Sequence, residues 1–239
     1  MGDRKKTLVL FDVGAVELEL DYSRFYQEAA KISTRYKNDP DAFKDAFVAS
    51  NLENRLMVRE LTAAEYLMQL RNLILPGIEL SDQGLMDINS CCWPRQVEKV
   101  VALKRKIHDA GYSVGIFSNM TELALGILSA RFPEVFETYD PASPKIYSFE
   151  TGSTKSEDKM YERIRGYGKV ILIDDNAAYV ARAVERFGWK GILFTPYIDR
   201  AEAIRAKEHT GAMHSENLKM VNSEDGLAGA LRAFGVDVK

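Results

Sequence analysis

Apolar runs that each end in a polar residue recur along this chain, and they constrain its fold more than any other feature. The first run is Thr7–Phe11, which Asp12 follows directly. Similar runs lie at 113–117, 170–173 and 191–194, and stretches of helical spacing separate them. A short run rich in Val, Ile, Leu and Phe is typical of a strand buried on both faces of a sheet. The alternation therefore predicts an α/β fold, a mostly parallel sheet with helices on both faces.

The stretch between the first two strands has no strand pattern and is expected to be helical. Apolar residues recur at helical spacing from Tyr22, and again after Asp39-Pro40, where proline takes the first position of a helix. A capping-box pattern at Thr62 begins another helix, and a short one is expected at 81–89. The aromatic stripes of these helices are expected to form the core of the insert. The predicted domains are a Rossmann-like core, residues 1–20 and 93–239, and an all-helical cap, residues 21–92.

Residues 16–21 alternate apolar with acidic side chains, a pattern typical of a half-exposed strand. We expect a hairpin arm or flap here, beside the end of the first strand, with Glu17 and Glu19 facing solvent. Other expected elements lie further along the chain. They are a helix from Pro94 to Gly111, a short strand near Val135-Phe136, a brief strand at 146–149, a helix after Lys155, a polar helical tail from Arg200 and a last helix at 227–234.

Composition excludes several classes of protein. The chain has 239 residues, 46% hydrophobic and 28% charged, which is ordinary for a soluble globular protein. Its formal net charge of -3 gives no electrostatic case for binding nucleic acid or an anionic membrane. No apolar run approaches the roughly 20 residues of a membrane helix. The only cysteines, Cys91 and Cys92, are adjacent, so we expect neither a disulfide framework nor a metal-ligand spacing, and a cytoplasmic setting is the default. The sequence favours no oligomeric state.

Polar residues follow the predicted strands directly. In open parallel sheets, ligands bind beyond the carboxyl ends of the strands, which is where these residues are expected to lie. They are Asp12, Ser118-Asn119 and Asp174-Asp175-Asn176, and Lys155 precedes a helix. Neighbouring carboxylates repel one another unless a cation joins them, and Mg²⁺ is usually held by one or two carboxylates and a substrate phosphate. The lysine, hydroxyl and amides suit phosphoryl oxygens. Beside a metal, an aspartate can itself attack phosphorus and form an acyl-phosphate.

The order of these residues resembles the four motifs of the haloacid dehalogenase-like (HAD) hydrolase superfamily. Phe11-Asp12-Val13-Gly14-Ala15-Val16 resembles the first motif and Phe117-Ser118-Asn119 the second. Lys155 stands for the third, and Ile173-Asp174-Asp175-Asn176 resembles the fourth. The resemblance covers residues 7 to about 196 and includes the position where many members carry a helical cap. Within the superfamily the chain is most similar to bacterial sugar-phosphate phosphatases, such as those acting on glucose 1-phosphate.

The resemblance implies a Mg²⁺-dependent phosphomonoesterase acting on a small phosphorylated metabolite through an aspartyl-phosphate. Asp12 would be the nucleophile and a metal ligand, and the Gly14 carbonyl a second ligand. Of the acidic pair, Asp175 is the first choice for the metal and Asp174 the second. Ser118 and Asn119 would bind phosphate, and Lys155 would stabilise charge, with Lys145 as the alternative lysine.

The sequence departs from the family pattern at three positions. Gly14 stands where most phosphatases of the superfamily have an aspartate that acts as general acid and base, an effect worth about 10²- to 10⁴-fold. Catalysis would then need a good leaving group, or a carboxylate from the cap or flap such as Glu17 or Glu19, or it would be very poor. Ser156 and Tyr179 replace a frequent proline and a frequent Asp or Asn.

Alternatives to these assignments remain open at the level of sequence. A catalytically silent relative would bind a phosphorylated ligand or a protein partner through the cap. A dehalogenase also uses an aspartate nucleophile, but it needs no metal, so the retained Asp174-Asp175 pair argues against it. Ser118-Asn119 and Asp175-Asn176 are also residue types that cap helices, and Lys155 is also of a type that is mostly exposed.

Overall fold

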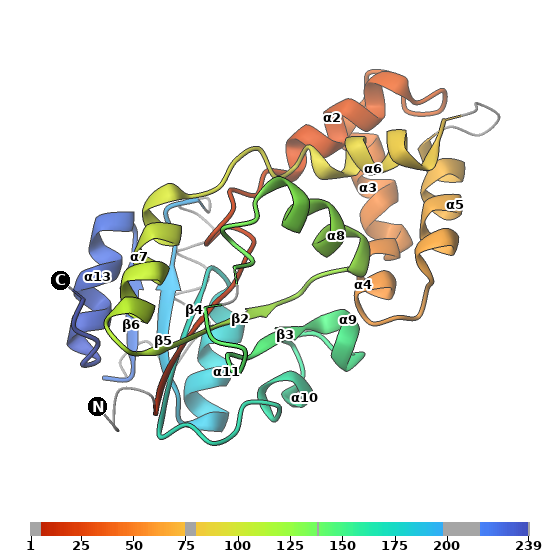
Figure 1. The fold of residues 1–239 in the computed structure, drawn as a ribbon. Coiled ribbons are helices and arrows are strands. Elements are labelled where there is room, and N and C mark those ends of the chain that lie inside the picture. The colour runs from red at the N-terminus through yellow and green to blue at the C-terminus, as the bar shows by residue number, and fades with distance from the viewer. Residues whose placement is uncertain (1–5, 75–79, 138, 198–215, 239) are drawn as a thin grey trace.

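A six-stranded parallel sheet forms the centre of the molecule in the computed structural model, which describes residues 6–74, 80–137, 139–197 and 216–238. The strand order is β3-β2-β1-β4-β5-β6, and every neighbouring pair is parallel. This confirms the predicted α/β class (Figure 1). The strands are β1 (Thr7–Phe11), β2 (Ser113–Ser118), β3 (Lys145–Tyr147), β4 (Lys169–Asp174), β5 (Lys190–Phe194) and β6 (Leu218–Val221).

Helices cover both faces of this sheet, because its central strands are apolar on both sides. In β1, Val9 and Phe11 belong to the hydrophobic cluster that includes residues of α7 and α13, whereas Leu8 and Leu10 belong to another with residues of α10 and α11. All five β1 residues are buried, as its unbroken apolar run predicts. The helices outside the insert are α7 (Glu98–Asp109), α8 (Glu122–Arg131), α9 (Ser148–Thr151), α10 (Asp158–Tyr161), α11 (Ala177–Phe187) and α13 (Glu224–Ala233).

Within residues 22–74 and 80–90, five helices follow β1 and form what we call the helical insert, residues 22–90; Figure 1 shows most of them grouped at the end of the molecule opposite α13. Phe25 and Phe43 are fully buried within it, with ring centroids 5.6 Å apart, so the aromatic stripes do form its core. The predicted capping box also forms, since the Glu65 amide donates to Thr62 Oγ1 at 3.2 Å. The insert consists of α2 (Tyr22–Ile32), α3 (Pro40–Ser50), α4 (Leu52–Met57), α5 (Ala63–Ile74) and α6 (Asp82–Ser90).

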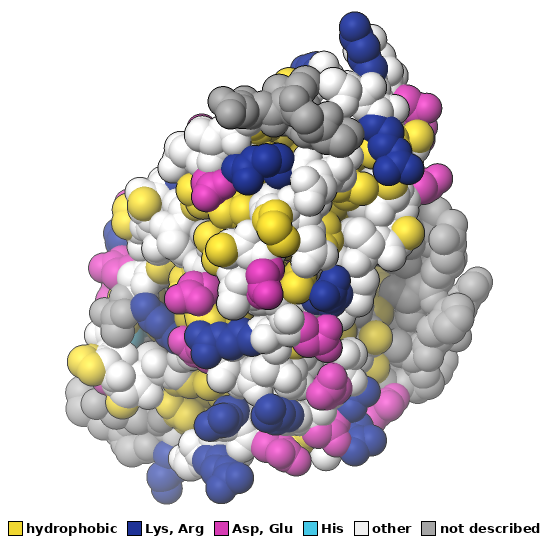
Figure 2. Space-filling view, turned by 90° about the vertical axis from the view of Figure 1, so that its right-hand side faces the viewer, with side chains coloured by type: hydrophobic (Ala, Val, Ile, Leu, Met, Phe, Trp, Pro, Cys, Tyr) yellow, Lys and Arg dark blue, Asp and Glu magenta, His cyan; other side chains and the backbone are white. Residues whose placement is uncertain are grey.

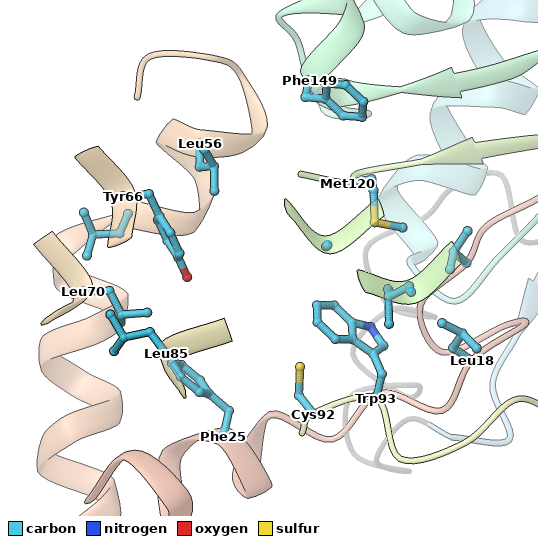
Figure 3. Packing of buried hydrophobic residues seen from close by; sticks show 14 of the residues in the cluster. Leu18, Phe25, Leu56, Tyr66, Leu70, Leu85, Cys92, Trp93, Met120 and Phe149 are labelled. Carbon is cyan, nitrogen blue, oxygen red and sulfur yellow. The ribbon is translucent and has the colours of Figure 1, made fainter. Parts of the chain in front are cut away.

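The insert packs against the end of the sheet rather than standing apart. One hydrophobic cluster joins Leu56 and Tyr66 of the insert to Trp93, Met120 and Phe149 outside it. Figure 3 shows Leu56 and Tyr66 on one side of this contact, facing Met120 and Trp93 on the other. The division into a core domain and a cap domain remains a prediction.

The prediction of a hairpin arm or flap at residues 16–21 is wrong. Val16, Glu17 and Leu18 are all fully buried, and the segment forms turns with isolated bridges instead of a hairpin. Glu17 lies inside because a buried lysine, Lys104 of α7, pairs with it. Alternation alone does not distinguish a solvent-facing acid from one that an interior cation neutralises.

Several smaller elements also differ from expectation. The helix predicted from Pro94 begins only at Glu98, because Gln96 first makes an antiparallel bridge with Leu18. Val135 and Phe136 lie in a turn, and the brief strand is Lys145–Tyr147, after which α9 begins. The helices at the capping box, at 81–89 and near 227–234 are confirmed, whereas α4 and β6 were not expected. The tail predicted from Arg200 lies, up to residue 215, outside the described residues.

Acidic and basic side chains of the described residues are interspersed on the face that Figure 2 shows. Within the described ranges every helix is too short or too polar to span a bilayer.

Candidate active site

The carboxyl ends of three adjacent strands, β2, β1 and β4, bring the predicted site residues together. β1 lies between the other two, and the chain passes to one side of it for β2 and to the other for β4. Such a switch point is where open parallel sheets bind ligands. Phe11 pairs with Ile173 across β1 and β4, and the Asp12 amide donates to the Ile173 carbonyl at 2.9 Å. This register sets Asp12 beside Asp174.

Lys155 joins these two aspartates. Its Nζ lies 2.9 Å from Asp12 Oδ2 and 2.5 Å from Asp174 Oδ2, and its side chain is fully buried. Burial alone would lower the pKa of Lys155, but the charges of Asp12 and Asp174 outweigh it and hold that pKa above its ordinary value. The alternative of a solvated lysine is therefore wrong. The lysine is a permanent cation between two carboxylates.

Asn119 and two tyrosines hold the backbone and side chain of Lys155 in place. The Lys155 amide donates to Asn119 Oδ1 at 2.9 Å, and Asn119 Nδ2 donates to the Tyr179 hydroxyl at 3.2 Å. The Tyr161 hydroxyl donates to the Lys155 carbonyl at 3.0 Å, and the Lys155 ammonium lies 5.7 Å from the Tyr179 ring centroid. Tyr179, which departs from the family pattern, thus supports the lysine instead of a metal ligand.

The three aspartates form a cluster that fits a hard divalent cation. Carboxylate oxygens of Asp12, Asp174 and Asp175 all lie within 4.8 Å of one another. Burial raises the pKa of Asp174 to about 6, although Lys155 opposes this. Burial and then the charge of Asp174 raise the pKa of Asp175 well above its ordinary value. Because one lysine cannot neutralise three carboxylates, this oxygen-only set is of the kind that holds Mg²⁺.

The alternative role as helix caps is wrong for Ser118-Asn119, whereas Asn176 does cap a helix. Helix α8 takes its N-cap from Thr121, whose hydroxyl accepts the Ala124 amide at 3.0 Å, so Ser118 and Asn119 do not cap it. Ser118 ends β2 and is buried. Asn176 does cap α11, since its side chain accepts the amides of the first helical turn.

The other candidate residues have partners of their own. The Lys145 ammonium donates to the Phe136 carbonyl at 2.6 Å, at the start of β3. Glu17 pairs with Lys104 inside the molecule, and Glu19 pairs with Arg95 at 2.6 Å. Neither glutamate replaces the side chain that Gly14 lacks.

Sequence reasoning missed Glu53 of α4, which lines a small pocket next to Gly14. Glu53 lines a pocket of about 50 Å³ together with Gly14 and Asn119. Its carboxylate accepts the Tyr22 hydroxyl at 3.1 and 3.2 Å, and burial raises its pKa to about 7. The available indication was an acid between the apolar residues Leu52 and Leu56, in a stretch with no helix expected.

Comparison with known proteins finds similarity in structure alone. No family model and no curated protein sequence matches the chain. A HAD family enzyme from Bacteroides thetaiotaomicron superposes with a TM-score of 0.68 at 18% identity, over 83% of this chain and 98% of that one. The same enzyme in complex with magnesium and inorganic phosphate gives a TM-score of 0.67 at 17% identity, over 83% and 99%.

Dehalogenases share the architecture as well. The L-2-haloacid dehalogenase from Xanthobacter autotrophicus superposes with a TM-score of 0.56 at 14% identity, over 95% of this chain and 98% of that one. At these identities the likeness concerns the fold alone. The chain therefore has the haloacid dehalogenase-like fold that the four sequence motifs imply.

Proposed function

We propose that this chain is a Mg²⁺-dependent phosphomonoesterase that hydrolyses a small phosphorylated metabolite through an aspartyl-phosphate on Asp12. The observation that supports this most is the position of Asp12, paired at 2.9 Å with a fully buried lysine inside a cluster of three carboxylates. Such a cluster suits a cation and a phosphate together. The Bacteroides thetaiotaomicron enzyme of this fold binds magnesium and inorganic phosphate, which is consistent with the proposal.

Each site residue then has a definite task. Asp12, Asp175, Asp174 and the Gly14 carbonyl would hold Mg²⁺, which supplies positive charge to the phosphoryl oxygens when bound. An Asp12 oxygen attacks phosphorus, a bond to phosphorus forms, and the bond to the leaving oxygen breaks with its electron pair. Water then attacks the acyl-phosphate, which releases inorganic phosphate and restores the Asp12 carboxylate.

The phosphate and its negative charge would be held by residues from β2 and by the lysine. Ser118 and Asn119 offer a hydroxyl and a side-chain amide, and Lys155 keeps its positive charge through the reaction. The helical insert would act as the cap that selects the substrate, because it supplies one wall of the pocket next to Gly14. We also propose a cytoplasmic location, because the adjacent Cys91 and Cys92 form no disulfide framework.

Two other functions are less well supported. Metal-free dehalogenation would use Asp12 in the same way, but it gives no reason for three buried or half-buried carboxylates within 4.8 Å of one another. A catalytically silent protein that binds a phosphorylated ligand or a protein partner is suggested by the departures from the family pattern at Gly14, Ser156 and Tyr179. It gives no reason for a fully buried cation 2.9 Å from Asp12.

The test is phosphate release from a panel of sugar phosphates and nucleotides, with Mg²⁺ or with EDTA. We expect turnover that EDTA abolishes and that Asp12→Asn lowers by about 10³-fold or more, as loss of a nucleophile does. Asp45→Asn is the matched control, because Asp45 is exposed on the insert. Turnover that survives in Asp12→Asn would contradict the mechanism. An inactive parent that still binds Mg²⁺ would favour the silent protein.

A further inference from the structure

A small pocket lies between the helical insert and Gly14, two residues after Asp12. Gly14 and Asn119 line it from the sheet, and Tyr22 and Glu53 line it from the insert. Trp93 and Met120, which also line it, lie between the insert and the sheet in Figure 3. Its volume is about 50 Å³, far below the roughly 300–1,000 Å³ of pockets for drug-sized ligands. The space beside Gly14 therefore suits a small leaving group.

Glu53 is the carboxylate that this pocket contains. Helix α4 directs Leu52 and Leu56 into the interior, and Glu53, one and three positions away from them, lies partly buried between α2 and the sheet. The Tyr22 hydroxyl donates to both carboxylate oxygens, at 3.1 and 3.2 Å, and thereby fixes the orientation of the carboxylate. Glu53 takes no part in the steps proposed for Asp12, the metal ligands and Lys155.

The surroundings of Glu53 allow it to exchange a proton near neutral pH. Burial raises its pKa to about 7, and the Tyr22 hydrogen bond opposes that rise. The titratable groups that face it are all neutral at this pH. They are Tyr22 and Tyr26 on α2, Tyr66 on α5, and Cys92 after α6, whose own pKa values are all raised.

The space next to Gly14 is partly taken by Leu20. A Cβ on Gly14 would stand 3.3 Å from Leu20 Cδ2, which is tighter than about nine in ten real Cβ contacts, so Leu20 would have to shift slightly. Leu20 thus takes part of the space where the side chain of an aspartate would begin. The other acids near the turn are engaged elsewhere, because Glu17 pairs with Lys104 and Glu19 with Arg95.

We propose that Glu53 of the helical insert is the general acid and base of the reaction, in place of the side chain that Gly14 lacks. This rests on the proposed phosphatase function. As Asp12 attacks phosphorus and the leaving oxygen takes the electron pair of its bond, the protonated Glu53 carboxyl gives its proton to that oxygen, which leaves as an alcohol. The Glu53 carboxylate then takes a proton from water, whose oxygen bonds to phosphorus and displaces Asp12. Inorganic phosphate, the Asp12 carboxylate and protonated Glu53 result.

Glu53→Gln tests this with two substrates that differ in their leaving group. An alkyl phosphate needs a proton on its leaving oxygen, whereas acetyl phosphate is small and its leaving group departs as acetate without one. In single-turnover measurements we expect Glu53→Gln to slow the first step of the alkyl phosphate by about 10²- to 10⁴-fold. With acetyl phosphate, the rate of acetate release by Glu53→Gln should stay within about threefold of the parent rate, because this leaving group needs no proton. Phosphorylated Asp12 should then accumulate, because the variant lacks the base that activates water.

The pH profile provides a second measurement that a structural role would not affect. The rate of the parent on the alkyl phosphate should fall above about pH 7, where Glu53 loses its proton. Tyr22→Phe removes a hydrogen bond that lowers the pKa of Glu53, so this limb should move to higher pH. Glu60→Gln is the matched control, because the Glu60 side chain is 65% exposed nearby in the chain. It should change neither the rate nor the profile.

Each other outcome overturns a defined part of the reasoning. Equal slowing of both substrates in folded Glu53→Gln, or an unchanged alkaline limb, excludes proton transfer by Glu53. A parent that turns over and depends on Asp12, with Glu53→Gln fully active, overturns this inference and leaves the phosphatase function intact. A parent without metal-dependent turnover on either substrate overturns the function and the inference with it.

Discussion

Replacing Lys104 with methionine tests how the interior of this protein tolerates the buried carboxylate of Glu17. Both side chains are almost fully buried, and Lys104 Nζ lies 2.9 and 3.0 Å from the two Glu17 oxygens. Lys104 also donates to the Val135 carbonyl at 2.8 Å. Burial raises the pKa of Glu17 to about 7, although the charge of Lys104 opposes that rise. Without Lys104, folded Glu17 should keep its proton to still higher pH.

The size of the effect follows from proton linkage. In the unfolded chain Glu17 is ionised above about pH 4.3 in both proteins. Above about pH 7 the folded variant holds one proton that the folded parent has lost. A raised folded pKa means stability that is present at low pH and lost as pH rises, so the variant loses about 1.4 kcal/mol per pH unit relative to the parent. From pH 7 to about pH 9 this amounts to roughly 2.7 kcal/mol. The unpaired Val135 carbonyl adds about 1–3 kcal/mol at every pH.

Urea unfolding, monitored by tryptophan fluorescence, measures both the pH-dependent contribution of Glu17 and the constant contribution of the Val135 carbonyl. The difference in the free energy of unfolding between parent and Lys104→Met should be constant from pH 5.5 to about 7 and should then increase. In a Glu17→Gln background the same lysine substitution should show the constant part alone. A difference that is equal at pH 6 and 9 would show that Glu17 does not titrate in this range, and an increase that persists without Glu17 would show that another group causes it.

Two further predictions concern the packing of the sheet and the metal. Gly191→Ala places a Cβ 2.4 Å from Val180 Cγ1, so it should lower the free energy of unfolding by about 1–3 kcal/mol, and Val180→Ala should restore part of this in thermal unfolding. An unchanged melting temperature would show that β5 and α11 can move apart to accommodate the added methyl group without loss of stability. Mg²⁺ at about 100 times its Kd should stabilise the parent by about 2.7 kcal/mol. Asp175→Asn should lose most of this gain while Asp45→Asn keeps it; equal gains in both would exclude Asp175 as a ligand.

The positions of the site residues could be predicted from sequence because strand ends are encoded locally. An apolar run fixes a buried strand, and the residue after it must lie at the carboxyl edge of a parallel sheet. Asp12, Ser118 and Asp174 therefore lie where their motifs indicate, at the ends of β1, β2 and β4. Lys155 follows no strand of this kind. Its identification depended on the family resemblance, and the structure gives the physical reason in two salt bridges.

What the sequence could not reveal depends on partners far along the chain. The acidic alternation at 16–21 looked solvent-facing because Lys104, which neutralises Glu17, lies 87 residues away. Likewise β6 has only two buried residues, Leu218 and Val221, and owes its strand conformation to pairing with β5. A local pattern contains neither kind of information.

Glu53 illustrates where a local rule would have helped. Residues three and four positions apart share a helix face, so Glu53 shares its face with Leu56 and Met57. An acid beside two apolar residues on one face is either exposed at the edge of that face or buried with a partner, and Tyr22 is that partner here. This hydrogen bond joins α2 to α4. Only the folded structure of the insert therefore shows that Glu53 has a partner. Its position opposite Gly14 then links the missing side chain of the first motif to a residue that no motif contains.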